Sequence, residues 1–405
     1  MSKKEWKAPA GSVFLPIGGG LIMYRWKNRL HDGFFVTVCA LLLLAGCAQE
    51  HMTLQSILDT PGHHASNGFQ FLARGHVEDA DREFEAALQL DNSFSRAHSG
   101  LALITGIRGD FPRAFHFLEL AKKYAKNGED RATVSVGEMR LYTMQKGGGW
   151  LARVKSSFDD ALRSEPDWPE AWYYLGAAYK QAYKFHEAEE AFNKVTDLHS
   201  RLAWQARKEL RGVRKIIRAM PESSVGKSIA VKNVITRADT AALLVEELKL
   251  DKVYEDMVRQ GKDLPSAAGV QRKTGLPAVP YDVKAHPRRS DIEIALHLNV
   301  NGLGRLPDGS FGPEQPETRA DYAMIMEDIM ATIRQDPTLK KRFIGKASPF
   351  SDIGNEDPFF NAVMLCTNET SIMEPGAGIF NPEGSVSGAD AVLILRKLKE
   401  ELGIF

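Results

Sequence analysis

The chain has 405 residues, which is enough for two or three domains of ordinary size. Its hydrophobic content of 43% and charged content of 26% are typical of a globular protein. Lysine plus arginine and aspartate plus glutamate both number 52, so no overall field favours nucleic acid as a partner. The three cysteines, Cys39, Cys47 and Cys366, are too few for a disulfide framework or a cysteine-based zinc site.

An apolar run from Phe34 to Ala48 follows a short basic stretch near the start of the chain. The run is shorter than the roughly 20 residues that a membrane-spanning helix needs, and it has the length of the apolar part of a secretory signal. It contains Leu-Ala-Gly-Cys, which ends at Cys47. This combination resembles the signal and lipobox of bacterial lipoproteins. A short buried helix that happens to end in Gly-Cys is the alternative interpretation.

The lipoprotein resemblance implies that Cys47 carries a diacylglycerol, that the signal peptide at 23–46 is removed, and that the new amino group is acylated. Two or more acyl chains would give stable anchoring. Ala48 stands where aspartate would signal inner-membrane retention, so the resemblance implies the outer membrane, with the protein facing the periplasm. Residues 1–22 precede a complete signal, and we expect them to be a gene-model extension. No cofactor is expected other than this covalent lipid.

Helical repeats are predicted at 61–202, after a linker at 47–60. The best copy resembles the tetratricopeptide (TPR) repeat through Trp172, Leu175, Gly176, Tyr179, Ala188 and Phe192. Weaker copies precede it in phase, so we expect about four repeats, with a short insertion near 127–131. Because one helical hairpin cannot bury its own apolar face, the hairpins should stack into an α-solenoid, which a helix at 203–221 should cap.

The resemblance to TPR proteins also implies a binding face. The signature residues are expected to pack the helices together, so we assign binding to the neighbouring face, on the concave side of the solenoid. In the fourth repeat that face is predicted to carry Glu170, Tyr173 and Lys180. Solenoids of this kind bind a peptide or a partner protein, and a protein partner is therefore expected. For Tyr173, simple packing against neighbouring residues is the alternative.

Three further segments, at 235–248, 317–330 and 386–399, align without gaps. Each opens with threonine or serine and has aspartate three residues later, which predicts a capped helix start. A turn-rich segment with an aromatic-x-proline pattern precedes the second and the third. Together these elements resemble the surface-layer homology (SLH) module. We therefore expect a helical SLH-like domain at 222–401, with one truncated and two full modules.

The SLH resemblance implies noncovalent binding of a cell-wall glycan, often one with an acidic pyruvyl ketal. A guanidinium near a helix start can bind a carboxylate through two hydrogen bonds, so Arg237 and Arg319 are candidate glycan ligands. Asp239 and Asp321 are candidates with them, unless these aspartates only cap helices. In the third module Gly388 replaces the arginine.

No sequence motif for a catalytic or metal site was found, including G-x-S-x-G, H-E-x-x-H and the dinucleotide fingerprint, so we expect no enzyme and no metal. The predicted fold is mostly all-α, a TPR solenoid followed by a helical SLH-like domain. The predicted function is tethering or scaffolding at the outer membrane, between a protein partner and peptidoglycan or another envelope polysaccharide. The alternative is a TPR assembly lipoprotein for secretion, pilus or outer-membrane protein biogenesis, with a purely structural SLH-like half.

Overall fold

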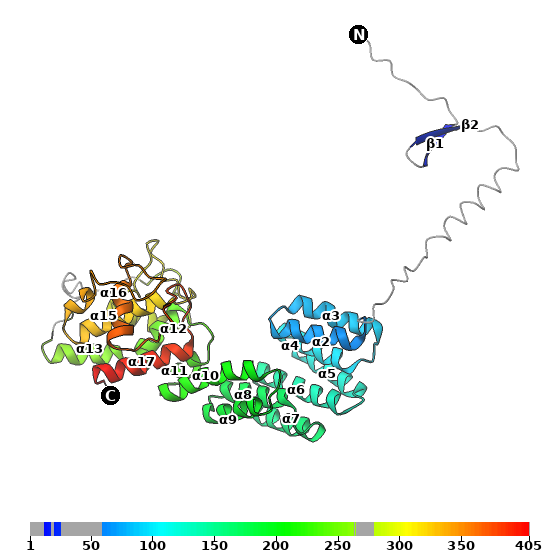
Figure 1. Ribbon diagram of the computed structural model, residues 1–405, viewed down its shortest axis with the longest axis horizontal. Helices are drawn as coiled ribbons and strands as arrows, with labels where there is room; N and C mark the ends of the chain where they lie inside the picture. Colours follow the sequence, from blue (N-terminus) through cyan, green and yellow to red (C-terminus); the bar gives the residue numbers. More distant parts are fainter. Residues whose placement is uncertain (1–11, 18–19, 26–58, 263, 265–278, 405) are drawn as a thin grey trace, which may run out of the picture. The chain divides into compact units, whose positions relative to one another are not determined.

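The computed structural model describes residues 12–17, 20–25, 59–262, 264 and 279–404. This part of the chain is mostly helical, which confirms the predicted class in its coarse form (Figure 1). The chain divides into two compact units, Met1–Asp59 and Thr60–Phe405. In the first, β1 (Ser12–Ile17) and β2 (Gly20–Arg25) form an antiparallel hairpin. The apolar run and Cys47 lie outside the described residues.

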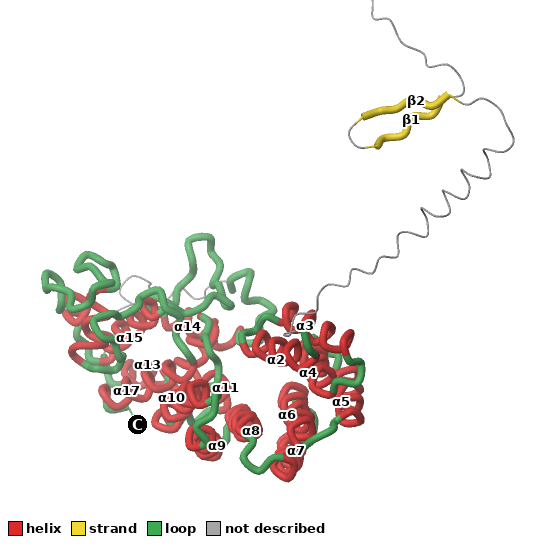
Figure 2. Tube along the Cα trace, turned by 45° about the vertical axis from the view of Figure 1, so that its right-hand side comes forward, coloured by secondary structure: helices red, strands yellow, loops and turns green. Residues whose placement is uncertain are grey.

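The first half of the larger unit consists of helical hairpins. Its helices are α2 (Pro61–Ala73), α3 (Val77–Leu90), α4 (Ser95–Ile107), α5 (Phe111–Tyr124), α6 (Gly128–Gln145), α7 (Trp150–Ser164), α8 (Pro169–Gln181), α9 (Phe185–Asp197) and α10 (Ala203–Ala219). Consecutive helices pack against each other, and α2 also contacts α4, α4 contacts α6, and α6 contacts α8 (Figure 2). The first helices of successive hairpins therefore lie side by side.

Glycines allow these helices to approach closely. The ring of Phe84, on α3, is fully buried between α2 and α4. A Cβ atom added at Gly68 would lie 2.6 Å from this ring, and one added at Gly100 would lie 2.3 Å from it. Gly176 and Phe192 repeat the arrangement between α8 and α9, at 2.9 Å. At each of these glycines, an aromatic ring thus occupies the space that the side chain of any larger residue would need.

The third hairpin is longer than the others, but not where the sequence predicts an insertion. Asn127 is the N-cap of α6 and accepts a hydrogen bond of 2.8 Å from the N–H of Asp130. Residues 127–131 are therefore the cap and first turn of a helix. The additional length lies in α6 itself, which has 18 residues against 13 in α4.

The second half of the larger unit encloses a separate apolar core. Its helices are α11 (Ser224–Ala230), α12 (Arg237–Ala242) with the π-helical η2 (Leu243–Glu247), α13 (Leu250–Arg259), α14 (Arg289–Leu298), α15 (Arg319–Ile333), the 3-10 helix η4 (Pro337–Lys341), α16 (Phe360–Met364) with the π-helical η5 (Leu365–Glu369), and α17 (Gly388–Leu402). The large side chains of Phe311, Tyr322 and Phe380 are fully buried in this core.

A closed ring of three backbone hydrogen bonds joins the three aligned segments. The N–H of Ile235 donates to the carbonyl of Val386 (2.9 Å), Val386 donates to Glu317 (3.0 Å), and Glu317 donates to Ile235 (3.0 Å). Each of these residues stands directly before the N-cap of its helix, α12, α15 or α17. The three helix starts are therefore related by a local pseudo-threefold axis.

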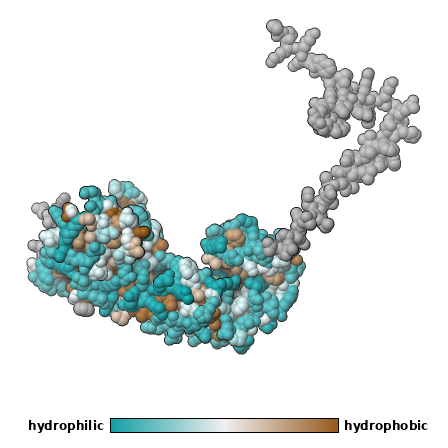
Figure 3. All heavy atoms as spheres, in the orientation of Figure 1, coloured by the Kyte–Doolittle hydropathy of each residue, from teal (hydrophilic) through white to brown (hydrophobic). Residues whose placement is uncertain are grey.

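The α10 helix connects the two halves of the larger unit. It packs on α9 and also on α17, so it follows the last hairpin and is covered on a second side. Lys215 on α10 donates to Asp390 on α17 at 2.6 Å. The outer surface in Figure 3 is mainly hydrophilic, with apolar residues in scattered spots. Trp204, also on α10, is one of the exposed apolar residues, with 67% of its surface accessible.

Candidate functional site

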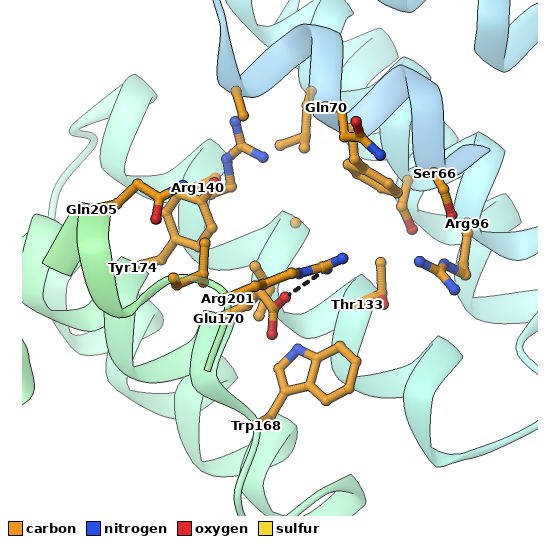
Figure 4. Close-up of a pocket in the computed structure, with 17 residues that line it drawn as sticks. Ser66, Gln70, Arg96, Thr133, Arg140, Trp168, Glu170, Tyr174, Arg201 and Gln205 are labelled. Atoms are coloured by element: carbon orange, nitrogen blue, oxygen red, sulfur yellow. Dashed lines mark hydrogen bonds and ion pairs between the residues drawn. The ribbon is translucent and has the colours of Figure 1, made fainter. Parts of the chain in front are cut away.

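The first helices of the hairpins line a cavity of about 300 Å³, which we call the inner pocket (Figure 4). Residues of α2, α4, α6 and α8 contribute to it, together with the segment that enters α10. Three aromatic residues, Phe69, Trp168 and Tyr174, form part of its lining. Because Phe69 comes from the first hairpin and Trp168 and Tyr174 come from the fourth, the pocket exists only when the hairpins stack.

Three arginines also line the inner pocket, and they differ in their partners. Arg96 forms an ion pair with Glu129 (2.7 Å), and Arg201 forms one with Glu170 (2.9 Å). The guanidinium of Arg140 lies 4.6 Å from the ring centroid of Tyr174, a cation–π contact. Within the described part of the chain, Arg140 has no carboxylate partner and no hydrogen bond.

Several polar atoms of the inner pocket are buried without a hydrogen-bond partner. They are the Nε of Arg96, the Oγ of Ser99, the Nε1 of Trp168 and the Oε1 of Gln205. Ser99 is only 1% exposed. Burying an unpaired polar group costs about 1–3 kcal/mol, so such groups are uncommon in folded proteins and call for a partner. A ligand with complementary polar atoms would recover this energy.

The structure places the predicted partner-binding residues differently from one another. Glu170 lines the inner pocket. Tyr173 and Lys180 do not: the ring of Tyr173 packs edge-on against Phe192 (5.7 Å), and Lys180 forms an ion pair with Glu209 of α10 (2.8 Å). Tyr173 therefore packs against α9 and Lys180 pairs with α10, away from the inner pocket.

The residue that the sequence prediction missed on α8 is Tyr174, four positions after Glu170. Positions four apart lie on one face of a helix, so the i, i+4 spacing from Glu170 could have identified it. The same spacing relates Thr133 to Gly137 on α6, with Arg140 three residues further along. The periodicity is thus visible in the sequence once one pocket residue is known.

The arginines that the SLH resemblance singles out are bound within the fold. Arg237 is 8% exposed. Its Nε donates to the carbonyl of Phe311 (2.9 Å), and its two terminal nitrogens donate to the carbonyls of Gly302 (2.9 Å) and Gly304 (2.7 Å). The guanidinium also lies 5.0 Å from the centroid of the Phe311 ring. Arg237 therefore links the start of α12 to the turn before α15.

Arg319 repeats this arrangement in the next module. Its Nε donates to the carbonyl of Phe380 (2.8 Å), and a terminal nitrogen donates to the carbonyl of Glu374 (3.1 Å). Its guanidinium is 4.4 Å from the centroid of the Phe380 ring. Burial lowers the pKa of Arg319 from its ordinary value, while Asp390 and Asp352 oppose this effect.

The third helix start, that of α17, has no space for an arginine at the position equivalent to Arg237 and Arg319. A Cβ atom at Gly388 would lie 1.8 Å from the carbonyl oxygen of Ile229, at the end of α11. The N–H of Gly388 donates to the carbonyl of Lys232 (2.9 Å). The short segment around α11 thus takes the place of a full turn-rich segment, which explains the glycine in the third module.

The two predicted aspartates cap helices. Asp239 is 1% exposed, accepts from the N–H of Thr236 (3.1 Å), and pairs with Lys232 (2.8 Å). Asp321 accepts from the hydroxyl of Thr318 (2.7 Å) at the start of α15. Neither geometry requires a ligand, because the N-cap accounts for the position of the Asp321 carboxylate, and the N-cap and Lys232 account for that of Asp239.

A polar cavity of about 530 Å³ lies beside α15, and we call it the polar cavity. Arg237 and Asp321 both border it, whereas Arg319 and Asp239 do not. The asparagines of the 299–301 turn and the side chain of Arg305 also line it. Arg305 is exposed and makes no ion pair or hydrogen bond with the described residues. Its guanidinium is available to an anion.

Glu317 stands at an unusual place for a carboxyl group. It is fully buried in the backbone ring, where the two equivalent residues are Ile235 and Val386. One carboxyl oxygen accepts from the hydroxyl of Thr240 (2.9 Å), and the other has no partner. Burial raises the pKa of Glu317 to about 7.

The described residues were also compared with the requirements of metal sites, reactive thiols and membrane-spanning helices. No group of three or more histidine, cysteine, aspartate or glutamate side chains among them is arranged to hold a metal ion. The thiol of Cys366 is free and buried, and burial raises its pKa. None of the described helices is long and apolar enough to cross a membrane. In comparisons with known proteins, no family model matches the chain and no curated protein matches it significantly.

Proposed function

We propose that this chain is a noncatalytic, lipid-anchored protein of the outer membrane that faces the periplasm. In this proposal, a TPR-like α-solenoid formed by α2–α9 holds a protein partner, and an SLH-like domain formed by α11–α17 binds peptidoglycan or another envelope polysaccharide. The main support for this proposal is the inner pocket. Separate hairpins present aromatic rings and unpartnered polar atoms to one cavity, as a peptide-binding surface requires.

The second binding function is supported by the polar cavity. It combines an unpaired cation, Arg305, with the amide side chains of Asn299 and Asn301. A polysaccharide offers hydroxyl groups to such amides, and an acidic substituent would pair with the guanidinium. Since the guanidinium groups of Arg237 and Arg319 are bound to backbone carbonyls, we assign the glycan contact to Arg305 instead. The lipid anchor at Cys47 rests on the sequence, because that residue lies outside the described part.

Sedimentation with purified cell-wall sacculi tests the polysaccharide contact. The fragment from Gln49 onward contains the whole compact unit Thr60–Phe405 and should pellet with the sacculi. Arg305→Ala should remain in the supernatant. Lys341→Ala removes one exposed positive charge from the same half without changing the cavity lining, and it should pellet like the parent fragment. If the parent fragment stays in the supernatant, the wall-binding proposal is wrong.

A second candidate function has one observation in its favour. The guanidinium groups of Arg237 and Arg319 donate to backbone carbonyls, which is what a purely structural half requires. In that case the chain is a TPR assembly lipoprotein for secretion, pilus or outer-membrane protein biogenesis. If the parent fragment does not pellet with the sacculi but still binds a peptide, the second function is favoured.

A further inference from the structure

We propose that the exposed face of α10 docks on the surface of an anionic phospholipid bilayer. The contact residues are one tryptophan and three basic residues, which we call the basic stripe: Trp204, Arg207, Lys208 and Arg211. The proposed function attaches the chain to a membrane only through the lipid on Cys47 and gives the folded part no membrane contact of its own. The closeness of a bilayer rests on that proposed anchor.

The basic stripe lies on one face of its helix. The three basic residues follow Trp204 by three, four and seven positions, and residues at these spacings are neighbours on a helix surface. The other side of α10 is apolar and buried in the protein, through Ala206, Leu210, Val213 and Ile216. Because this burial fixes the rotation of the helix, the basic stripe points away from the core.

The α10 helix concentrates positive charge in a chain that is neutral overall. It contains six basic residues and one acidic residue, whereas the whole chain has 52 residues of each sign. The acidic residue, Glu209, forms an ion pair with Lys180 of α8 (2.8 Å). The basic residues after the stripe have carboxylate neighbours: Arg214 faces Glu189, Lys215 faces Asp390 and Arg218 faces Glu374.

The basic side chains of the stripe have no such neighbours. Arg207, Lys208 and Arg211 are exposed, and their side chains make no ion pair or hydrogen bond with the described residues. Their charges are therefore available to an external anionic surface. A second copy of the chain would meet this face with the same positive charge, so self-association through the stripe is disfavoured.

Trp204 specifies the kind of anionic surface. Its side chain is 67% exposed and makes no ring contact or hydrogen bond with the described residues. Tryptophan is enriched at the boundary between water and a bilayer, because its ring is apolar and its N–H remains hydrogen-bonded there. A tryptophan beside several lysines or arginines is the composition of a helix face that binds anionic lipid headgroups. This combination favours a phospholipid surface over an acidic protein.

Vesicle sedimentation with the fragment from Gln49 onward tests the contact. This fragment contains the compact unit Thr60–Phe405 and lacks Cys47, so its binding cannot come from acyl chains. It should pellet with vesicles of phosphatidylethanolamine and phosphatidylglycerol, and it should stay in the supernatant with vesicles of phosphatidylcholine alone. Added salt should release it, because salt screens exposed charges.

A triple variant connects vesicle binding to the stripe. Arg207→Gln, Lys208→Gln and Arg211→Gln together should weaken binding by roughly 100-fold, since each basic residue near an anionic surface contributes about fivefold. The matched control replaces three exposed basic residues of the hairpins whose side chains have no partner among the described residues: Arg74→Gln, Arg131→Gln and Lys155→Gln. It removes the same charge and should bind like the parent. Thermal melts verify that both variants are folded.

Tryptophan fluorescence gives a second, independent measurement. Brominated phospholipids quench a tryptophan that enters the bilayer surface. Quenching should be stronger in the parent fragment than in Trp204→Phe, because the other tryptophans of the fragment lie at half-buried positions in the hairpins. Equal quenching in the two proteins would show that Trp204 does not touch the bilayer.

The inference is overturned if the parent fragment does not bind anionic vesicles, or if the triple variant binds them as tightly as the parent. It is also overturned if the triple variant loses pelleting with sacculi but not with vesicles, because the stripe would then contact the wall. None of these results bears on the anchor. Absence of acyl chains on Cys47, measured by mass spectrometry of the full chain, would overturn the proposed anchoring alone.

Discussion

The Nε of Arg237 donates to the carbonyl oxygen of Phe311, and the same guanidinium lies over the Phe311 ring. Arg319 and Phe380 have the same relationship in the next module. Each arginine thereby joins the start of one capped helix to the turn that precedes the next. In this protein the arginine of the repeated segment is thus a structural link of the pseudo-threefold arrangement, and stability measurements should reveal it.

Arg237→Ala should be strongly destabilising. The change removes the donor from three carbonyl oxygens, those of Phe311, Gly302 and Gly304. Since each unsatisfied buried group costs about 1–3 kcal/mol, the free energy of unfolding should fall by about 3–5 kcal/mol in urea denaturation. Arg305→Ala, at an exposed residue without partners, should change it by less than about 0.5 kcal/mol. Equal urea midpoints for the two variants would contradict the structural role of Arg237.

Gly388→Ala should also destabilise the protein. The added methyl group would lie 1.8 Å from the carbonyl oxygen of Ile229, and a backbone atom cannot move away as a side chain can. We expect a loss of about 3 kcal/mol or more, at the upper end for overpacked sites. Gly212→Ala on α10 is the control, because nothing lies within 4 Å of the new Cβ. It should gain about 0.5–1 kcal/mol from helix propensity. Similar melting temperatures for both variants would refute this explanation of the third module.

Stability should depend on pH through Glu317. Burial raises the pKa of this carboxyl group from 4.5 to about 7 in the folded chain. The folded state therefore binds the proton more tightly than the unfolded state, and the stabilisation is complete below pH 4.5 and lost as pH rises through about 7. A shift of this size corresponds to about 3 kcal/mol.

Glu317→Gln isolates this contribution, since the neutral amide keeps an acceptor for Thr240 and cannot ionise. The free energy of unfolding of the parent should fall relative to that of the variant between pH 5 and pH 8. The measurement is a series of urea denaturation curves across this range. Parallel pH profiles would show that Glu317 does not titrate in the folded protein as proposed.

Phe84→Ala should disrupt the packing of the first two hairpins. The ring is fully buried and fills the space beside Gly68 and Gly100. Replacing a buried phenylalanine by alanine costs about 3–5 kcal/mol, because a cavity remains. Phe84→Leu should cost less, since it keeps most of the volume. Differential scanning calorimetry can compare the two, and equal costs would show that the ring volume does not determine the helix spacing.

Local signals in the sequence predict much of the helical framework. Thr236, Thr318 and Ser387 are the N-caps of α12, α15 and α17, because a hydroxyl followed three residues later by aspartate satisfies the first-turn N–H groups in any context. The pairing of Gly176 with Phe192 likewise follows from the size of the two residues. These features depend on neighbours along the chain, which one sequence contains.

The candidate sites are less visible in the sequence, because they depend on tertiary contacts. Tyr173 and Tyr174 differ by one position, and one residue rotates a side chain by about 100° around a helix, so a small error of phase exchanges the two faces. Arg305 lies in a loop without a motif, and only the folded chain places it in the polar cavity. The Arg237 guanidinium could not be assigned to backbone carbonyls until the position of a turn about 65 residues away was known.

Photo-cross-linking tests the central claim most directly, that the protein partner binds in the inner pocket. A peptide selected by the parent fragment is synthesised with a benzophenone group, irradiated in the complex and mapped by mass spectrometry. We expect cross-links on the first helices of the hairpins, α2, α4, α6 and α8, and on the start of α10. Cross-links confined to the second helices, α3, α5, α7 and α9, or to α11–α17 would contradict this claim.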